Sequence, residues 1–211
     1  GDRTIPVEVA QLSDSLKRMY APDKRVALFD VDYSFAGKNV MLRGVTTSAE
    51  AKAALLQGLA KADYKVMDCI QVLPDVKGLE GKTYGIINVS VANLRAAPDF
   101  SSEMMTQGLM GMPVHVLQRD GWVHIQTPDN YIAWVHRVGV HLVNEAEMAA
   151  WNNAEKIVVT AHYGFVYSKP DRTSQTISDV VAGNRFKWDG SKGAFYKVIY
   201  PLYAREFLFG S

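Results

Sequence analysis

The spacing of hydrophobic residues predicts two helices near the start of the chain. Over residues 7–20 the apolar side chains recur at helical spacing, and Pro22 follows the segment. A second helix is predicted over 48–62, where Ser48 precedes an alanine-rich run and Glu50 falls in the first turn. The apolar positions that define the first helix are Val9, Leu12, Leu16 and Met19.

Three segments around these helices have the pattern of strands. Residues 24–35 alternate with period two through Val26, Leu28, Asp30 and Asp32, a turn at 37–39 follows, and 39–47 and 64–74 are again strand-like. The order α-β-β-α-β predicts a small α+β segment over 1–80. The stretch "VMLRGVTTSAEAKAALLQGL" resembles the strand, turn and helix of BON-type domains.

A glycine- and lysine-rich linker is predicted at 75–83. The rest of the chain is predicted to be a tandem repeat of a unit built from short strands. We expect two all-β barrels, at 84–143 and 157–211, joined by a helical linker at 144–156 around Trp151. Matching residues are Pro98 with Pro170 and Gly111 with Gly183, 72 positions apart, then Trp122 with Phe195, Pro128 with Pro201 and Trp134 with Phe207, 73 apart.

The composition of the chain argues against several classes of protein. The formal net charge of +1 over 211 residues gives no concentrated basic patch, so we expect no nucleic-acid partner. Apolar runs are shorter than the roughly 18 residues of a membrane helix, so we expect no membrane span. The single cysteine excludes an intrachain disulfide and a cysteine-based zinc site.

The first repeat resembles a bacterial SH3 domain. The residues that carry the resemblance are "INVSVANLRAAPDFSSEMMTQGLMGMPVHVLQ", then "GWVHIQT" and "NYIAWV". An Asn-Leu-Arg triplet before a proline-containing loop and a Gly-Trp pair before the next strand are typical of that family. The resemblance implies short strands curled into a partly open barrel, with Pro98 in a loop because proline cannot donate to a strand ladder.

The order of segments resembles the front half of Bacteroides-type γ-D-glutamyl-L-diamino acid endopeptidases, which are NlpC-type cysteine peptidases also called dipeptidyl-peptidase VI. The phrase "EKIVVTAHYGFVYSKPDRTSQTISDVVAGNRFKWDGSKGAFYKVIYP" extends the likeness through the second repeat. It implies a protein of the cell envelope, expected to be periplasmic, that recognises peptidoglycan stem peptides with a free N-terminal L-Ala.

The chain differs from that family in two features, and each changes the function or fold that we expect. The family's catalytic cysteine domain would begin where this chain stops, at Ser211, so we expect no catalysis by the chain alone and a peptidase domain as a possible partner. Leu202 and Tyr203 replace a Pro-Asp-Gly turn near the end of the second repeat, which predicts an altered hairpin. The alternative function is an envelope scaffold whose SH3-like domains bind a protein partner.

The other residues that could carry chemistry are interpreted as structural or solvated side chains. Cys69 lies inside a predicted strand without the Ser-Gly that follows the family's nucleophile, so we expect a buried structural cysteine. Asp30 and Asp32 share one strand face and are expected to be solvated. We expect no cofactor and no metal, and histidines exposed on strands. The five histidines are His115, His124, His136, His141 and His162.

The candidate binding residues cluster around the second half of the first SH3-like domain. The resemblance implies that Tyr131, in a Tyr-x-x-Trp motif, holds the free amine of the peptide, and a phenol can accept a hydrogen bond from an ammonium group. Trp122 and Trp134 are expected in the barrel core or at its rim. Asn93 and Asp129 are expected to flank the same patch.

Overall fold

The computed structural model describes residues 4–200 and 206–210. Contacts within the chain divide it into two compact units. The first comprises Gly1–Val76 together with Asn130–Ile132, and the second comprises Lys77–Asp129 together with Ala133–Ser211. The fold is mixed α+β, mostly strand, and the described part contains three α-helices, none of which is long and apolar enough to cross a bilayer.

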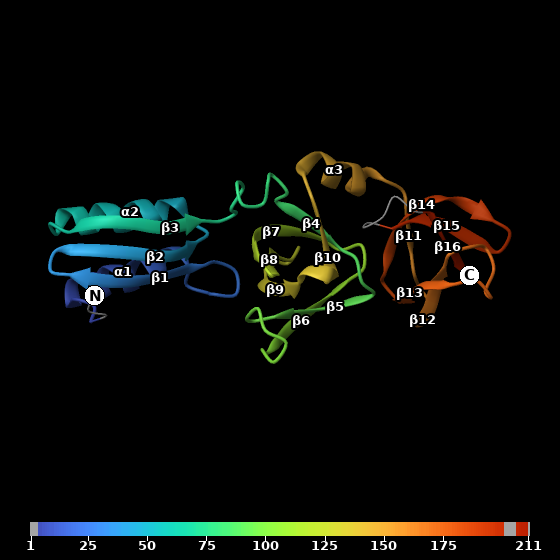
Figure 1. Ribbon diagram of the computed structural model, residues 1–211, viewed down its shortest axis with the longest axis horizontal. Coiled ribbons are helices and arrows are strands. Elements are labelled where there is room, and N and C mark those ends of the chain that lie inside the picture. Colours follow the sequence, from blue (N-terminus) through green and yellow to red (C-terminus); the bar gives the residue numbers. More distant parts are fainter. Residues whose placement is uncertain (1–3, 201–205, 211) are drawn as a thin grey trace. The chain divides into compact units, whose positions relative to one another are not determined.

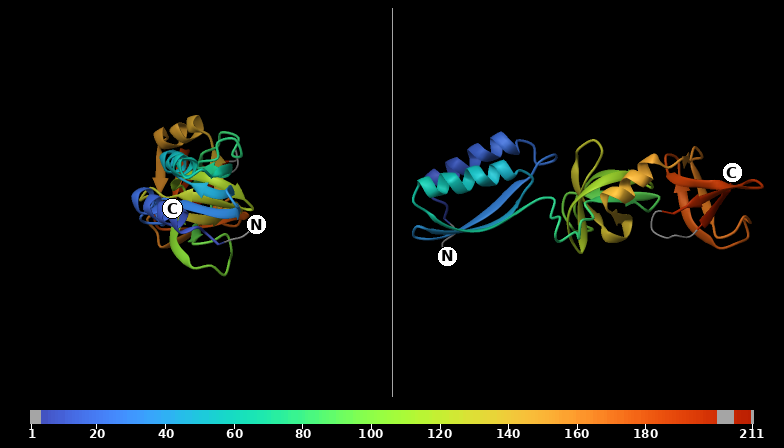
Figure 2. Two further views of the ribbon diagram at one scale, coloured as in Figure 1. Left: turned by 90° about the vertical axis from the view of Figure 1, so that its left-hand side faces the viewer. Right: turned by 90° about the horizontal axis from the view of Figure 1, so that it is seen from above.

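The first unit is a three-stranded sheet covered on one face by two helices (Figures 1 and 2). The strand order is β1-β2-β3, with β1 and β2 antiparallel and β2 and β3 parallel. The order along the chain is the predicted α-β-β-α-β. Its elements are α1 (Val7–Tyr20), β1 (Phe29–Ala36), β2 (Asn39–Thr46), α2 (Ala49–Lys61) and β3 (Lys65–Val72).

Ser48 begins α2 as predicted: its hydroxyl accepts a hydrogen bond from the Ala51 amide at 3.0 Å and so satisfies one unpaired N–H of the first turn. The first strand differs from the prediction, because it begins at Phe29 and its inward positions are the odd ones. Phe29 and Tyr33 lie in the core between sheet and helices, whereas Val26 is exposed.

The second unit contains two antiparallel sheets, and the first has the order β10-β4-β7-β8-β9-β5-β6. Its core is formed by inward side chains such as Leu94, Val123, Ile125 and Val135. The strands are β4 (Tyr84–Ile87), β5 (Val91–Arg95), β6 (Met104–Leu109), β7 (Pro113–Asp120), β8 (Trp122–Gln126), β9 (Ile132–His136) and β10 (Val140–Val143), with the 3-10 turn η1 (Arg137–Gly139) before β10.

The second sheet of this unit has the order β11-β14-β15-β16-β12-β13. Its order repeats that of the first sheet once β10 is set aside. The strands are β11 (Lys156–Val158), β12 (Tyr163–Tyr167), β13 (Thr176–Val181), β14 (Arg185–Lys192), β15 (Phe195–Ile199) and β16 (Glu206–Gly210). The substituted turn at Leu202 and Tyr203 lies outside the described residues.

Strand positions recur from one sheet to the other at an almost constant interval. Strands β12, β13 and β14 begin 72 residues after β5, β6 and β7, β15 begins 73 after β8, and β16 begins 74 after β9. Backbone hydrogen bonds recur as well: the Gly111 amide donates to the Ile87 carbonyl at 2.8 Å, and the Gly183 amide donates to the Val159 carbonyl at 2.8 Å. Both glycines have positive φ, which suits this turn.

A helix and one methionine connect the two sheets of the second unit. α3 (Glu145–Asn153) falls in the predicted helical linker and begins with a capping box at Asn144. Trp151 of this helix is buried, and its indole N–H donates to the Gly111 carbonyl at 3.2 Å. Met110, from the turn after β6, is fully buried in the core of the other sheet, which includes Phe186.

Candidate functional site

Two neighbouring strands of the second unit carry the same triplet, Trp-Val-His, at 122–124 in β8 and at 134–136 in β9. Side chains alternate between the faces of a strand, and the two valines, Val123 and Val135, lie in the core. The two tryptophans and two histidines therefore lie on the opposite face. They form a polar and aromatic surface, which we call the Trp-His face (Trp122, His124, Trp134 and His136).

Antiparallel pairing places each tryptophan of the Trp-His face against a histidine. The rings of His124 and Trp134 stack with centroids 4.0 Å apart and planes 6° apart. Trp122 meets His136 edge to face at 5.2 Å. Phe100, from the loop after β5, packs on this second pair at 4.8 Å from Trp122 and 5.1 Å from His136 while remaining 67% exposed. One Trp–His pair is therefore capped by an exposed aromatic ring.

His124 is the only histidine of the described residues that is buried, at 7% exposed, despite lying opposite the barrel core. The Gln118 amide nitrogen lies 3.2 Å from its Nδ1. A donating amide makes Nδ1 the acceptor and assigns the ring proton to Nε2. Burial lowers the pKa of His124 to about 4, so the ring is neutral around neutral pH.

Strand β5 extends the same face beside β9. Arg95 is paired with Trp134, and its guanidinium donates to the Ser102 carbonyl at 2.6 Å. Asn93, two residues earlier, shares the face of Arg95; it is exposed, and its Oδ1 accepts a hydrogen bond from the Gln107 amide at 3.0 Å. The structure thus places Asn93 on the sheet face that carries Trp134.

The remaining two candidates lie in the loop between β8 and β9. Asp129 is exposed and accepts a hydrogen bond from the Thr127 hydroxyl. Tyr131 is half-buried and lies in the segment Asn130–Ile132, which groups with the first unit. Trp122 and Trp134 are half-buried, and each packs on a histidine.

Sequence reasoning missed three members of this surface: Phe100, His124 and His136. The repeated Trp-Val-His triplet was the signal that could have found the histidines. Two such triplets on adjacent antiparallel strands bring tryptophan against histidine whenever the valines face the core. Phe100 had no such signal, because it reaches the pair from a loop.

The structure also places the residues that were considered for other chemistry. Cys69 is exposed, so the expectation of a buried cysteine was wrong; its neighbour Ile70 takes the inward position of β3. Asp30 and Asp32 are exposed, as expected for a solvated strand face. His115 is exposed as expected, but His124 is buried. Among the described residues no group of three or more His, Cys, Asp or Glu side chains is placed to hold a metal.

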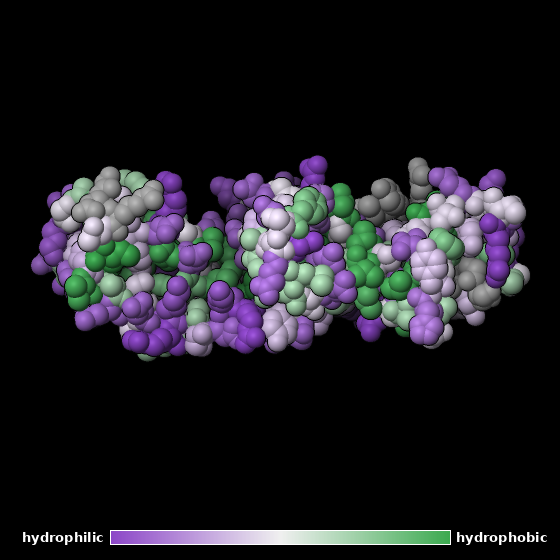
Figure 3. All heavy atoms as spheres, turned by 90° about the horizontal axis from the view of Figure 1, so that it is seen from below, coloured by the Kyte–Doolittle hydropathy of each residue, from purple (hydrophilic) through white to green (hydrophobic). Residues whose placement is uncertain are grey.

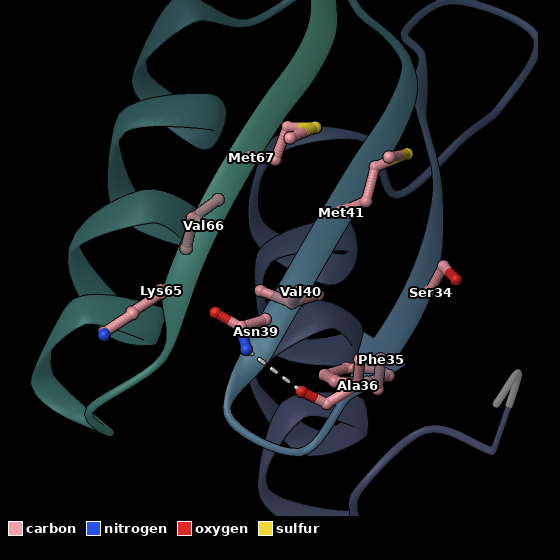
Figure 4. A pocket seen from close by; sticks show the side chains of 9 residues that line it. All are labelled: Ser34, Phe35, Ala36, Asn39, Val40, Met41, Lys65, Val66 and Met67. Atoms are coloured by element: carbon pink, nitrogen blue, oxygen red, sulfur yellow. Dashed lines mark hydrogen bonds between the residues drawn. The ribbon is translucent and has the colours of Figure 1, made fainter. Parts of the chain in front are cut away.

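A shallow pocket of about 450 Å³ lies on the first unit at the end of its sheet (Figure 4). Met41 and Met67 are register partners on β2 and β3 and lie side by side there, and Met67 is 58% exposed. The Asn39 amide donates to the Ala36 carbonyl at 3.3 Å at the lower edge of the pocket. No residue of the predicted binding site lines this pocket.

Comparison with known proteins identifies one domain of the chain. Residues 94–138 match the family described as the SH3 domain of bacterial dipeptidyl-peptidases. The matched residues run from β5 through the Trp-His face to η1. The chain therefore contains a bacterial SH3 domain of the dipeptidyl-peptidase type, as the sequence resemblance predicted.

A curated relative makes the relationship more specific. Over 101 residues the chain is 28% identical to dipeptidyl-peptidase 6 of Lysinibacillus sphaericus, an alignment that covers 47% of this chain and 37% of that protein. The chain is thus homologous to part of a dipeptidyl-peptidase 6 and spans little more than a third of its length in the alignment.

Solved structures of NlpC/P60 proteins are also similar to the chain. An NlpC/P60 family protein from Bacillus cereus is 20% identical, with 61% of this chain and 54% of that chain covered and a TM-score of 0.49. An NlpC/P60 endopeptidase from Photobacterium damselae subsp. piscicida is 13% identical, with 66% and 34% covered and a TM-score of 0.46.

Proposed function

We propose that this chain is the non-catalytic, substrate-binding part of a γ-D-glutamyl-L-diamino acid endopeptidase that acts in peptidoglycan turnover. The ligand is a murein stem peptide with a free N-terminal L-Ala. The proposal rests on the homology to dipeptidyl-peptidase 6, taken together with the match to an SH3 domain of the dipeptidyl-peptidase type. The name of that relative describes release of dipeptides, a reaction that requires a peptide with a recognisable terminus.

The chemistry of the loop before β9 supports recognition of an amine. Tyr131 offers a phenol oxygen that accepts a hydrogen bond from an ammonium group and a ring face that attracts a cation. Asp129, exposed in the same loop, adds a carboxylate of complementary charge. The Trp-His face, with Trp122 and Trp134, offers ring surfaces against which the peptide's apolar groups can pack.

Specificity in this proposal comes from exclusion. A rim that seats an N-terminal ammonium rejects peptides whose amine is blocked or extended, because these lose the charge and gain bulk. The strands that recur in the second sheet are interpreted as a second SH3-like copy, with domains at 84–143 and 157–211 joined by α3. A location in the cell envelope, in the periplasm, follows from the proposed ligand.

Calorimetric titration of the whole chain with L-Ala-γ-D-Glu-diaminopimelate tests the proposal. We expect saturable binding without cleavage, and at least about tenfold weaker binding after Tyr131→Ala, the size of one lost ammonium contact. Tyr131→Phe separates the hydroxyl from the ring. Tyr196→Ala, an exposed tyrosine of β15, is the matched control.

The N-acetylated form of the same peptide completes the test. It is expected to bind at least about tenfold more weakly, because acetylation removes the ammonium charge. Equal affinity of the free and acetylated peptides would contradict amine recognition. No heat with either peptide, together with capture of an envelope protein by the chain, would favour the alternative function as a scaffold.

A further inference from the structure

A groove of about 650 Å³ lies in the second unit, and both sheets contribute to it; no residue of the Trp-His face lines it. Figure 3 shows hydrophobic side chains gathered between the two sheets of this unit. The groove is bordered by the segment after β4, by η1, by β13 and by the residue that follows β15. Its lining includes Asn88, Arg137, Val138, Ile177, Ser178 and Tyr200.

Asn88 is the unusual member of this lining. It is only 4% exposed, and its side-chain oxygen Oδ1 is buried without a hydrogen-bond partner among the described residues. Leaving a buried acceptor unpaired costs about 1–3 kcal/mol, so such groups are rare and call for a partner. Because Asn88 lines a groove, a ligand bound in that groove can supply the missing donor.

Hydrogen bonds to the backbone hold Asn88 in place on both sides. Its N–H donates to the Gly139 carbonyl at 3.2 Å, which fixes it beside η1. Its carbonyl accepts a hydrogen bond from the Tyr200 hydroxyl at 3.2 Å. The backbone that carries the acceptor is therefore fixed before any ligand arrives, which lowers the entropy cost of binding.

The opposite wall is also held by hydrogen bonds. The Ser90 hydroxyl donates to the carboxylate of Asp179 at 3.0 Å, and the Asn184 amide donates to the Ser90 carbonyl at 2.9 Å. The Ser178 hydroxyl donates to the Asp179 carbonyl at 2.8 Å. The hydroxyl proton of Ser178 is thus used within the protein.

One charge and a pair of apolar side chains complete the groove. Arg137 is exposed and forms no ion pair with the described residues. Val138 beside it is 62% exposed, and Ile177 on the facing strand is half-buried. The groove therefore offers an acceptor for an N–H group, a guanidinium for an anion and a small aliphatic surface.

We propose that this groove binds the carboxyl-terminal end of a short peptide. The last amide N–H of the peptide donates to Asn88 Oδ1, its terminal carboxylate pairs with Arg137, and a small aliphatic side chain packs on Val138 and Ile177. Guanidinium and carboxylate form a charge-assisted pair that a neutral amide terminus cannot make. Tyr131 does not line this groove, and the proposal does not depend on the function proposed above.

Two probes that differ only in the C-terminal group test the proposal: acetyl-Ala-Ala with a free carboxylate and acetyl-Ala-Ala-amide. Each is titrated into the ¹⁵N-labelled chain while amide chemical shifts are followed. We expect saturable shifts of groove residues with the acid and at least about tenfold weaker binding of the amide. Arg137→Gln is expected to remove this preference, whereas Arg43→Gln, in the first unit, is expected to leave it unchanged.

Asn88→Leu separates ligand binding from a structural role. The substitution removes an unpaired buried acceptor, so the chain without peptide is expected to keep or gain resistance to unfolding while losing the response to the acid. Equal binding of acid and amide, no saturable shift with either probe, or unchanged binding after Arg137→Gln would overturn the proposal. Loss of thermal stability in Asn88→Leu without any peptide response would assign Asn88 Oδ1 to a bound water instead.

Discussion

The rings of His124 and Trp134 lie parallel, 6° apart in plane and 4.0 Å apart in centroid, on the face of the bacterial SH3 sheet that is turned away from its core. The indole covers the imidazole, and Gln118 contacts the imidazole through Nδ1. A polar ring is thus buried on what the strand alternation makes an outward face. Burial lowers the pKa of His124, because the charged imidazolium would lose its hydration there, and the indole covers one face of the ring.

Acidification is expected to weaken the folded second unit through His124. Its folded pKa, about 4, lies below the unfolded value of 6.5, so between these values the unfolded chain binds a proton that the folded chain does not. The contribution is complete above pH 6.5 and is lost as pH falls toward 4. At most about 3 kcal/mol of unfolding free energy is involved, measured by denaturant titration across this range.

Two variants identify His124 as the source. His124→Gln is expected to flatten the pH dependence, since the amide does not titrate. His162→Gln, at an exposed histidine, is expected to leave the slope unchanged. Burial also lowers the pKa of His141, so a residual slope in the same direction remains in both variants. An unaltered slope in His124→Gln would contradict the assignment.

Trp134 is expected to control the pKa of His124 directly. Trp134→Leu uncovers one face of the imidazole, restores hydration and is expected to move the pKa of His124 upward toward 6.5. Titration of the imidazole ring protons by NMR measures this. Trp188→Leu, a tryptophan of the second sheet that is 38% exposed, is the control and is expected to leave the His124 titration in place.

Periodicity and capping residues were sufficient to predict the first unit, because both signals are local. The order α-β-β-α-β and the cap at Ser48 are both present. The phase of the first strand was wrong, because polar Asp30 and Asp32 were placed on the same alternating row as Val26. Cys69 was misplaced for a similar reason: one residue decides the face of a strand, and Ile70 holds the inward one.

The binding surface was only partly predictable, because its contacts join distant parts of the sequence. The candidates Trp122 and Trp134 lie on the Trp-His face, but their histidine partners depend on strand register, which the loop between the strands sets. Phe100 belongs to a different loop, the one after β5. Asn88 looks like an ordinary polar residue in the sequence, and its unpaired oxygen follows only from its neighbours.

Gly44 is expected to resist substitution more strongly than Gly37. Gly44 has φ of +144°, and an added Cβ would lie 2.0 Å from the Asp30 carbonyl oxygen, a backbone atom of the paired strand. Gly37 also has positive φ, +60°, but open space around it. Gly37→Ala is expected to cost about 1 kcal/mol from backbone strain alone, and Gly44→Ala clearly more. Chemical denaturation of the two variants compares them, and equal losses would contradict the clash.

Met110 is expected to stabilise the second sheet although it follows β6 of the first. Its side chain is fully buried among Phe186 and the other core residues of that sheet, so Met110→Ala leaves a cavity there. The expected loss is about 2–5 kcal/mol of unfolding free energy. Hydrogen exchange locates it: amides of β12 to β15 are expected to lose protection, while those of β7 and β8 keep theirs.

Met104→Ala is the matched control for this test, because Met104 lies on β6 and is 49% exposed, so its removal leaves no cavity. Its effect on stability is expected to be within about 0.5 kcal/mol. Loss of protection confined to the first sheet in Met110→Ala would contradict the packing of Met110 in the other core. Loss confined to the second sheet would show that the turn at Met110 contributes part of that sheet's core, although Met110 follows a strand of the first sheet.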